Sequence, residues 1–174
     1  MRRSYGLQTL LIGCLVAMAA FMPTLTPAQD DAKVTKAMEI LKAKTAALGA
    51  PKLDGTDSVE GKVVPALYFG TTKINNDFAV VDQVVAEAGG TATLFVKAGE
   101  EFVRISTNVP KPDGSGRAIG TILDPNGKAI AAVRQNQAFY GEVPILGTPY
   151  MTGYEPIRDS RGDIIGIYYV GYKK

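Results

Sequence analysis

Three strand-forming segments follow one another at the C-terminal end of the chain and are separated only by short turns. They run over residues 139–146, 150–157 and 164–172, with glycine, proline and aspartate concentrated between them. Connections this short join neighbouring antiparallel strands, because a parallel connection needs a dozen or more residues. The sequence therefore predicts a three-stranded antiparallel meander, which limits the fold to classes built on an antiparallel sheet.

Two further segments extend this sheet. Residues 91–96 and 102–109 are rich in β-branched and aromatic side chains, which favour strands. The turn over residues 97–100 is short and contains glycine, so the two segments predict a hairpin. Hairpin and meander together predict one five-stranded antiparallel sheet.

A long amphipathic helix is predicted before these strands. Its buried positions recur at spacings of 4, 3, 4 and 3, which places them on one helical face: Val34, Met38, Leu41, Thr45 and Leu48. We expect Asp30 or Asp31 to cap the start and Gly49 to follow the end. The face can pack on the domain's own sheet or on a second copy of the helix, and a stripe this short favours the sheet.

The remaining elements are shorter. Residues 50–64 are polar and contain glycine, which is typical of a loop. A second helix is expected to begin at a cap within residues 75–77 and to stop at residues 89–90. A third, short helix is expected after Asp124, with Pro125 in its first position. The predicted fold class is α+β, with a long N-terminal helix and short helices between the strands of the sheet.

Residues 1–28 are typical of a cleaved secretory signal peptide. Two arginines lie near the start, residues 10–22 carry no charge, and residues 26–28 offer small side chains for cleavage. A charge-free run of 13 residues is shorter than the roughly 20 that a spanning helix needs. Cys14 within this run leaves a lipoprotein as the weaker alternative. We therefore expect export to the periplasm.

Composition excludes several kinds of chemistry. The chain has no histidine, and its single cysteine lies in the predicted signal peptide. These facts argue against histidine-activated nucleophiles, an imidazole general base, and zinc, haem or redox sites built on histidine or cysteine. Removing residues 1–28 takes away two of 19 basic side chains and none of 17 acidic ones, which leaves 17 of each. A neutral chain lacks the basic stripe that nucleic-acid binding requires, so we expect no enzyme, no cofactor and no nucleic-acid partner.

Four separated motifs carry a resemblance to a known family: GGTATLF, RISTNV, YMTGYEPI and DIIGIYYVG. In this order they resemble the single Cache sensory domain of the Cache 3/Cache 2 type, an extracytoplasmic module of bacterial chemoreceptors and sensor kinases. The resemblance covers residues 65–172, with the first helix in the family's usual place. It implies a PAS-like fold whose sheet and loops enclose a pocket for a small carboxylate, an amino acid or a related metabolite.

The resemblance also sets the expected organisation. It divides the chain into the signal peptide, an N-terminal helix and loop over residues 29–64, and the ligand-binding domain over residues 65–174. Receptors of this class continue into a second membrane helix and signalling domains, whereas this chain stops at Lys174. We therefore expect an exported, free-standing ligand-binding domain without its own output module.

Arg104 is the first candidate site residue. An arginine in the middle of a strand either points into solvent or is buried beside an acidic partner. A carboxylate pocket favours the bidentate fork of arginine over the point charge of lysine. The resemblance places Arg104 in the ligand-facing part of the sheet.

The other candidates are tyrosines and hydroxyl residues. Tyr150, Thr152 and Tyr154 alternate on one face of a strand, where they form either the core or a pocket wall. Adjacent Ser106 and Thr107 lie on opposite faces, so at most one faces the pocket unless the strand bulges. The expected ligand-binding residues are Arg104, Ser106, Thr107, Tyr140, Tyr150, Thr152 and Tyr154.

The predicted function is the binding of a small molecule outside the cytoplasm. The alternative is a Cache-like structural or partner-docking module with no small ligand. Expected partners are a small-molecule ligand, a membrane receptor, sensor kinase or transporter, and a second copy of the chain through the N-terminal helix.

Overall fold

The computed structural model describes residues 27–174. Residues 1–26, which hold most of the predicted signal peptide and Cys14, lie outside the described part, so the leader and its lipoprotein alternative stay predictions. Among residues 27–174, no helix combines the length and the apolar character that a membrane crossing requires.

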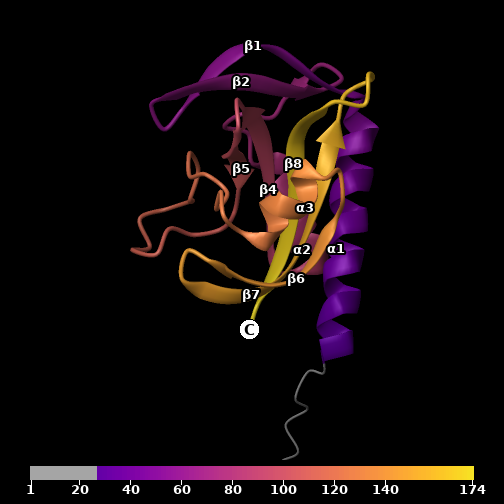
Figure 1. The fold of residues 1–174 in the computed structure, drawn as a ribbon, viewed down its shortest axis with the longest axis vertical. Helices are drawn as coiled ribbons and strands as arrows, with labels where there is room; N and C mark the ends of the chain where they lie inside the picture. The colour runs from indigo at the N-terminus through magenta and orange to yellow at the C-terminus, as the bar shows by residue number, and fades with distance from the viewer. Residues whose placement is uncertain (1–26) are drawn as a thin grey trace, which may run out of the picture.

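The central sheet has the predicted five antiparallel strands. They are β4 (Thr91–Ala98), β5 (Glu101–Thr107), β6 (Phe139–Ile145), β7 (Thr148–Arg158) and β8 (Ile164–Lys173). Their order is β5-β4-β8-β7-β6, so the hairpin and the meander meet where β4 pairs with β8 (Figure 1). The predicted α+β fold class is confirmed.

Helix α1 (Pro27–Leu48) confirms the predicted long helix. The predicted cap is wrong, because the helix begins at Pro27 and both Asp30 and Asp31 lie inside it. Asp30 lies in the first turn, where a carboxylate still interacts favourably with the positive end of the helix. The apolar stripe is used within the domain: Val34 and Leu41 are fully buried, and the helix packs on β7 and β8.

The loop predicted over residues 50–64 is wrong. The chain there forms β1 (Pro51–Val59) and β2 (Lys62–Phe69), which pair with the short β3 (Thr72–Lys73) in a second antiparallel sheet. Most side chains of β1 are exposed on both faces, so its composition shows no alternation of apolar and polar residues. β1 is a strand because it pairs with β2, and the sequence of β1 alone does not show this pairing.

Two short helices complete the fold. Helix α2 (Ala79–Ala88) is confirmed, but the predicted cap within residues 75–77 is wrong, because Phe78 holds the cap position and Asp77 Oδ1 accepts a hydrogen bond from the Ala79 amide at 2.8 Å in a turn ahead of it. Helix α3 (Lys128–Arg134) begins later than predicted. The Asp124 carboxylate accepts from the Asn126 amide at 3.0 Å and forms a turn ahead of the helix instead of a helix cap.

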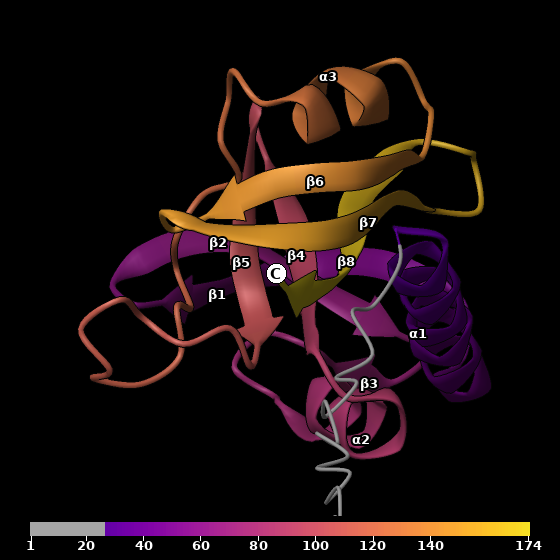
Figure 2. The same cartoon turned by 90° about the horizontal axis from the view of Figure 1, so that it is seen from below.

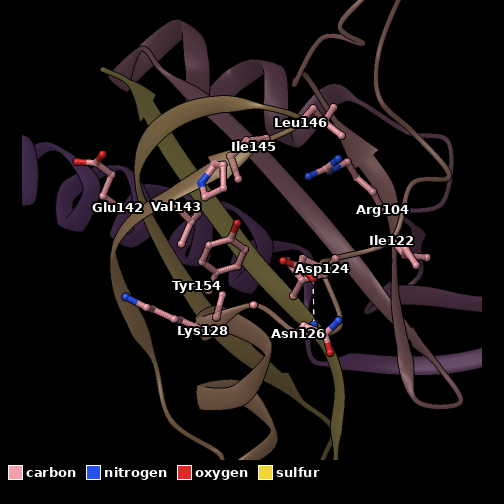
Figure 3. A pocket seen from close by; sticks show the side chains of 14 residues that line it. Arg104, Ile122, Asp124, Asn126, Lys128, Glu142, Val143, Ile145, Leu146 and Tyr154 are labelled. Carbon is pink, nitrogen blue, oxygen red and sulfur yellow. Dashed lines mark hydrogen bonds between the residues drawn. The ribbon is translucent and has the colours of Figure 1, made fainter.

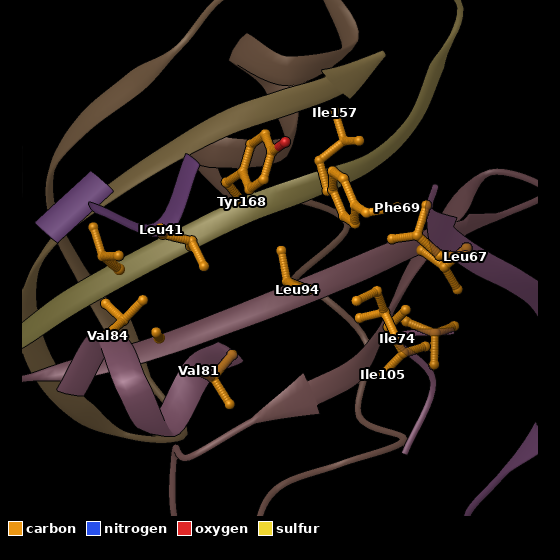
Figure 4. Close-up of a cluster of buried hydrophobic side chains, with 14 of the residues drawn as sticks. Leu41, Leu67, Phe69, Ile74, Val81, Val84, Leu94, Ile105, Ile157 and Tyr168 are labelled. Carbon is orange, nitrogen blue, oxygen red and sulfur yellow. The ribbon is translucent and has the colours of Figure 1, made fainter. Parts of the chain in front are cut away.

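The central sheet has a separate core on each face. On one face, α1, α2 and β2 bury aliphatic side chains such as Leu41, Leu67 and Val84 against Leu94 (Figure 4). On the other face, α3 packs on an aromatic core that includes Tyr154. Figure 2 shows α3 on one side of the sheet and α1 with α2 on the other.

We expect Gly70→Ala to destabilise the fold more than Gly55→Ala. Both glycines have positive φ, 59° at Gly70 and 70° at Gly55, where a side chain is strained. A Cβ at Gly70 would also meet the backbone of Leu48 and Gly49, whereas a Cβ at Gly55 meets nothing within 4 Å. We expect a loss of about 1 kcal/mol for Gly55→Ala and roughly 2 kcal/mol more for Gly70→Ala. Urea unfolding measures both, and equal losses would contradict the close approach of α1 to this turn.

Candidate functional site

A pocket of about 410 Å³ opens on the face of the sheet that carries α3. Its floor includes Arg104 of β5 and Tyr154 of β7. Residues 122–129, which lead into α3, and residues 142–146, at the β6–β7 turn, form its walls (Figure 3). Seven of its fourteen lining residues are aliphatic or proline. A mainly apolar pocket of this size with a few polar groups is typical of small-molecule sites.

Arg104 is buried, with only 3 % of its surface exposed. Its Nη1 donates to Thr121 Oγ1 at 2.6 Å, and its guanidinium lies 5.0 Å from the centre of the Phe95 ring. Its Nε is buried without a hydrogen-bond partner. Within residues 27–174 no acidic side chain forms an ion pair with it. An arginine in the middle of a strand was expected either to point into solvent or to lie buried beside an acidic partner. Arg104 does neither, since it is buried without an acidic side chain beside it.

The charge of Arg104 is poorly compensated. Burial lowers its pKa, and the nearby Tyr169 and Tyr154 hydroxyls oppose that effect. Arginine nevertheless stays protonated in proteins, so the charge remains in the core. A buried charge with an unused donor destabilises a fold unless another group accepts the hydrogen bond. The ring of Phe95 and the hydroxyl of Thr121 supply only part of that compensation.

A β-bulge and a crossing segment hold Arg104 in place. Leu94 pairs with Ser106 and Phe95 pairs with Arg104, so Ile105 is an extra residue in β5. The amide of Arg104 donates to the Thr121 carbonyl at 2.9 Å, and its carbonyl accepts from the Gly120 amide at 2.8 Å. The segment that leads into the pocket wall therefore also covers the edge of β5.

The remaining charged side chains of the pocket lie at its exposed rim. They are Asp124, Lys128 and Glu142. Glu142 forms an ion pair with Lys174 at 3.8 Å, and Asp124 is engaged by the Asn126 amide. The interior of the pocket is therefore positive, because Arg104 alone among these charges is buried. Among residues 27–174, acidic side chains form no cluster of three that could hold a metal ion.

Tyr154 is the second predicted residue that lines the pocket. It is 1 % exposed, and its ring packs 5.0 Å from Tyr169 and 6.2 Å from Phe139, measured between ring centres. Figure 3 shows its ring and hydroxyl between Val143 and Asp124. Burial raises the pKa of Tyr154, so its hydroxyl stays protonated and can donate a hydrogen bond to an anion.

Four other predicted residues lie near this pocket or on the strands beside it but do not line it. Tyr150 and Thr152 share the face of Tyr154: Tyr150 is in the aromatic core, and Thr152 Oγ1 donates to the Gly141 carbonyl at 2.7 Å. Thr107 Oγ1 lies 2.6 Å from Thr93 Oγ1. Ser106 donates to the Asp77 carbonyl at the start of α2, on the opposite side of the sheet.

Tyr140 lies on the α1 side of the sheet, away from the pocket. Its hydroxyl donates to Glu155 Oε1 at 2.6 Å, and Lys42 Nζ of α1 lies 2.6 Å from Glu155 Oε2. Burial raises the pKa of Tyr140, and Glu155 adds to that effect. Burial also raises the pKa of Glu155, but hydrogen bonds from Lys42 and Tyr140 outweigh it and leave the pKa below its ordinary value. This triad fastens α1 to β6 and β7.

Sequence reasoning missed most of the pocket walls. Asp124 was expected only as a helix cap, and neither Lys128 nor residues 142–146 were candidates. The turn composition around Pro125 marks an irregular segment, but nothing in the linear sequence shows that this segment folds back over β5. Hydrogen bonds between Thr121 and Arg104 bring it there, and they join segments from separate parts of the chain.

We expect Glu155→Gln to lower the melting temperature by a few degrees at pH 7, because the neutral amide loses the ion pair with Lys42. A carboxylate with a depressed pKa stabilises the fold above its unfolded pKa of about 4.3 and loses that effect as the pH falls through the folded value. The difference between the variant and the parent should therefore shrink below about pH 4.

The matched control is Glu87→Gln, which removes the more exposed ion pair with Lys44 of α1. Its effect at pH 7 should be smaller, since exposed pairs contribute little. Thermal melts of both variants from pH 3 to pH 7 make the comparison. A constant difference for Glu155→Gln across this range would show that packing, not charge, is lost.

Comparison with known proteins identifies a family for this chain. A family model described as the Cache 3/Cache 2 fusion domain matches residues 18–174. A search among curated proteins gave no match. Cache domains sense small molecules outside the cytoplasm and are ligand-binding, not catalytic, modules. The match covers nearly the whole chain and includes both sheets and α1, so this protein belongs to the Cache 3/Cache 2 fusion domain family.

Proposed function

We propose that this Cache domain binds a small molecule through a carboxylate group, with Arg104 as the anchoring cation. The supporting observation is that Arg104 lines a pocket while, within residues 27–174, its guanidinium has no acidic partner and hydrogen-bonds only through Nη1, to Thr121. A carboxylate in the pocket would accept a hydrogen bond from Nη2, which has no partner among the described residues and is not fully covered by protein atoms, and would neutralise the buried charge. Both effects would remove the electrostatic penalty that the unliganded fold carries.

The orientation of the guanidinium favours a planar, two-oxygen group. Nη1 is engaged by Thr121, and within residues 27–174 no hydrogen bond is made by Nε or Nη2. These two nitrogens form the side of the fork that matches the two oxygens of a carboxylate, and the second contact requires a small shift of the atoms that cover Nε. In Figure 3 the guanidinium points into the pocket from the side opposite Glu142. Tyr154 can donate a further hydrogen bond to the same group.

The other functional expectations stay predictions. They are a cleaved leader with a periplasmic location, a signalling or transport partner in the membrane, and a dimer through α1. Each of them depends on protein partners or on residues outside 27–174. The ligand is therefore the part of the function that can be tested first.

A thermal-shift screen of the purified protein tests the proposal directly. The panel consists of small carboxylates, amino acids, amines and purines. A ligand at 100 times its dissociation constant stabilises the fold by about 2.7 kcal/mol, which raises the melting temperature of a domain of this size by several degrees. We expect shifts from carboxylates and none from amines. Shifts from amines or purines alone would contradict the proposal, and no shift from any class would favour the partner-docking alternative.

Two variants of Arg104 test its role as the anchor. Arg104→Met and Arg104→Lys should each weaken binding of the best carboxylate at least tenfold, because a hydrogen bond to a charged group contributes about 1.5 to 3 kcal/mol. Without ligand, Arg104→Met should melt at the same temperature as the parent or higher, since it removes an uncompensated buried charge and keeps a similar volume. Isothermal calorimetry and thermal melts supply the two readouts.

Tyr154→Phe and Tyr140→Phe provide a matched pair of controls. Tyr154→Phe should weaken binding by roughly 1.5 to 3 kcal/mol, the contribution of one hydrogen bond to a charged group. Tyr140→Phe should leave binding unchanged, because Tyr140 lies on the α1 side. If Arg104→Met binds as tightly as the parent and melts several degrees lower, Arg104 is a structural residue and the proposal is wrong.

A further inference from the structure

The turn between β6 and β7 contains a residue that its geometry disfavours. Ile145 pairs with Thr148, so Leu146 and Gly147 form a two-residue turn. Both have positive φ, 49° at Leu146 and 87° at Gly147. Turns with this conformation strongly favour Asn-Gly or Asp-Gly, because the first residue must adopt a left-handed conformation. A bulky leucine there is strained, and such strain is found where a side chain serves a function.

A second turn of the same form also lacks asparagine or aspartate in its first position, but the residue there is polar. Glu60 and Gly61 join β1 to β2, since Val59 pairs with Lys62, and their φ values are 48° and 78°. The first residue there is polar and exposed. The two turns have nearly the same backbone, so turn geometry does not account for leucine in one of them.

The side chain of Leu146 lies at the rim of the pocket. It lines the same cavity as Arg104, on the side from which the guanidinium enters in Figure 3. It is 41 % exposed, and Ile122 across the rim is 37 % exposed. Few large apolar side chains in residues 27–174 are exposed to solvent, and Leu146 and Ile122 are two of them. A ligand with an apolar part would cover Leu146 and Ile122 and remove their contact with water.

The polar groups of the pocket limit what else the ligand can carry. Arg104 is its one buried cation, so a second carboxylate would have no second buried partner. Asp124 and Glu142 at the rim would repel such a second anion, and Lys128 is the one cation at the rim that opposes them. The apolar walls extend from Leu123 and Ala129 to Val143, which leaves a hydrocarbon surface between the guanidinium and the opening.

We propose that Leu146, together with Ile122, selects monocarboxylates with an apolar chain or ring by contacting that apolar part while Arg104 holds the carboxylate. This inference depends on the proposed function and adds the chemical class of the ligand. Leucine at a strained position is explained because asparagine, which suits the turn, would remove the apolar contact.

The test compares hexanoate with acetate by calorimetry on the purified protein and on Leu146→Asn. Each buried methylene strengthens binding by about fourfold, so the parent should bind hexanoate at least tenfold more tightly than acetate. Leu146→Asn should lose most of this preference and bind acetate as the parent does. Its melting temperature without ligand should be unchanged or higher, because asparagine accepts the left-handed conformation.

Glu60→Asn is the control, since it makes the same kind of change in the matching turn. It should keep the full preference for hexanoate. Adipate and norleucine complete the set of probes, because they add a second carboxylate and an ammonium group to a similar chain. We expect both to bind at least tenfold more weakly than hexanoate.

The possible failures are distinguishable. Equal affinity for acetate and hexanoate in the parent, or tighter binding of adipate or norleucine, would overturn the assignment of ligand class and leave Arg104 as the carboxylate anchor. A Leu146→Asn variant that melts lower and keeps its preference would show that Leu146 is a structural residue. Failure of all four carboxylates to bind would overturn both proposals together.

Discussion

The pairing of β4 with β8 is the interaction on which the other elements depend. Its register runs from Thr91 and Gly171 to Val96 and Gly166, and it joins the hairpin to the meander. A side chain at Gly166 would meet the backbone of Phe95, so this central pair has little freedom to change. The described residues contain no cysteine, and the sheet is therefore held by layers packed on both of its faces.

These two faces have different chemistry. The α1 side is closed by aliphatic packing around Leu94, and its polar contacts lie at the edge, where Lys42 meets Glu155. The other side combines tyrosine rings with the buried Arg104, and only α3 and one irregular segment cover it. An incomplete cover over a buried charge leaves space and an unused hydrogen-bond donor at the same point. The pocket therefore lies on the face that is incompletely covered.

Sequence periodicity was sufficient for elements whose side chains alternate between core and solvent. It predicted α1, the hairpin and the meander, but it missed β1 (Pro51–Val59), because an exposed strand has no such alternation. For the site, the family resemblance suggested Arg104, and the alternation of residues along one strand suggested Tyr154; both residues line the pocket. Neither could predict residues 122–129 or Leu146 as pocket walls, because long-range hydrogen bonds and a turn conformation place them there.

Two adjacent residues of β7 point to opposite faces of the central sheet. Tyr154 points into the pocket, and the next residue, Glu155, points to the opposite side and is clasped by Lys42 of α1 and by Tyr140. The planar peptide between them keeps their two Cα atoms at a fixed separation, so a shift of the β7 backbone at one residue also displaces the other. A shift of the β7 backbone at Tyr154 would therefore also move the half-buried carboxylate that is bonded to Lys42 of the long helix.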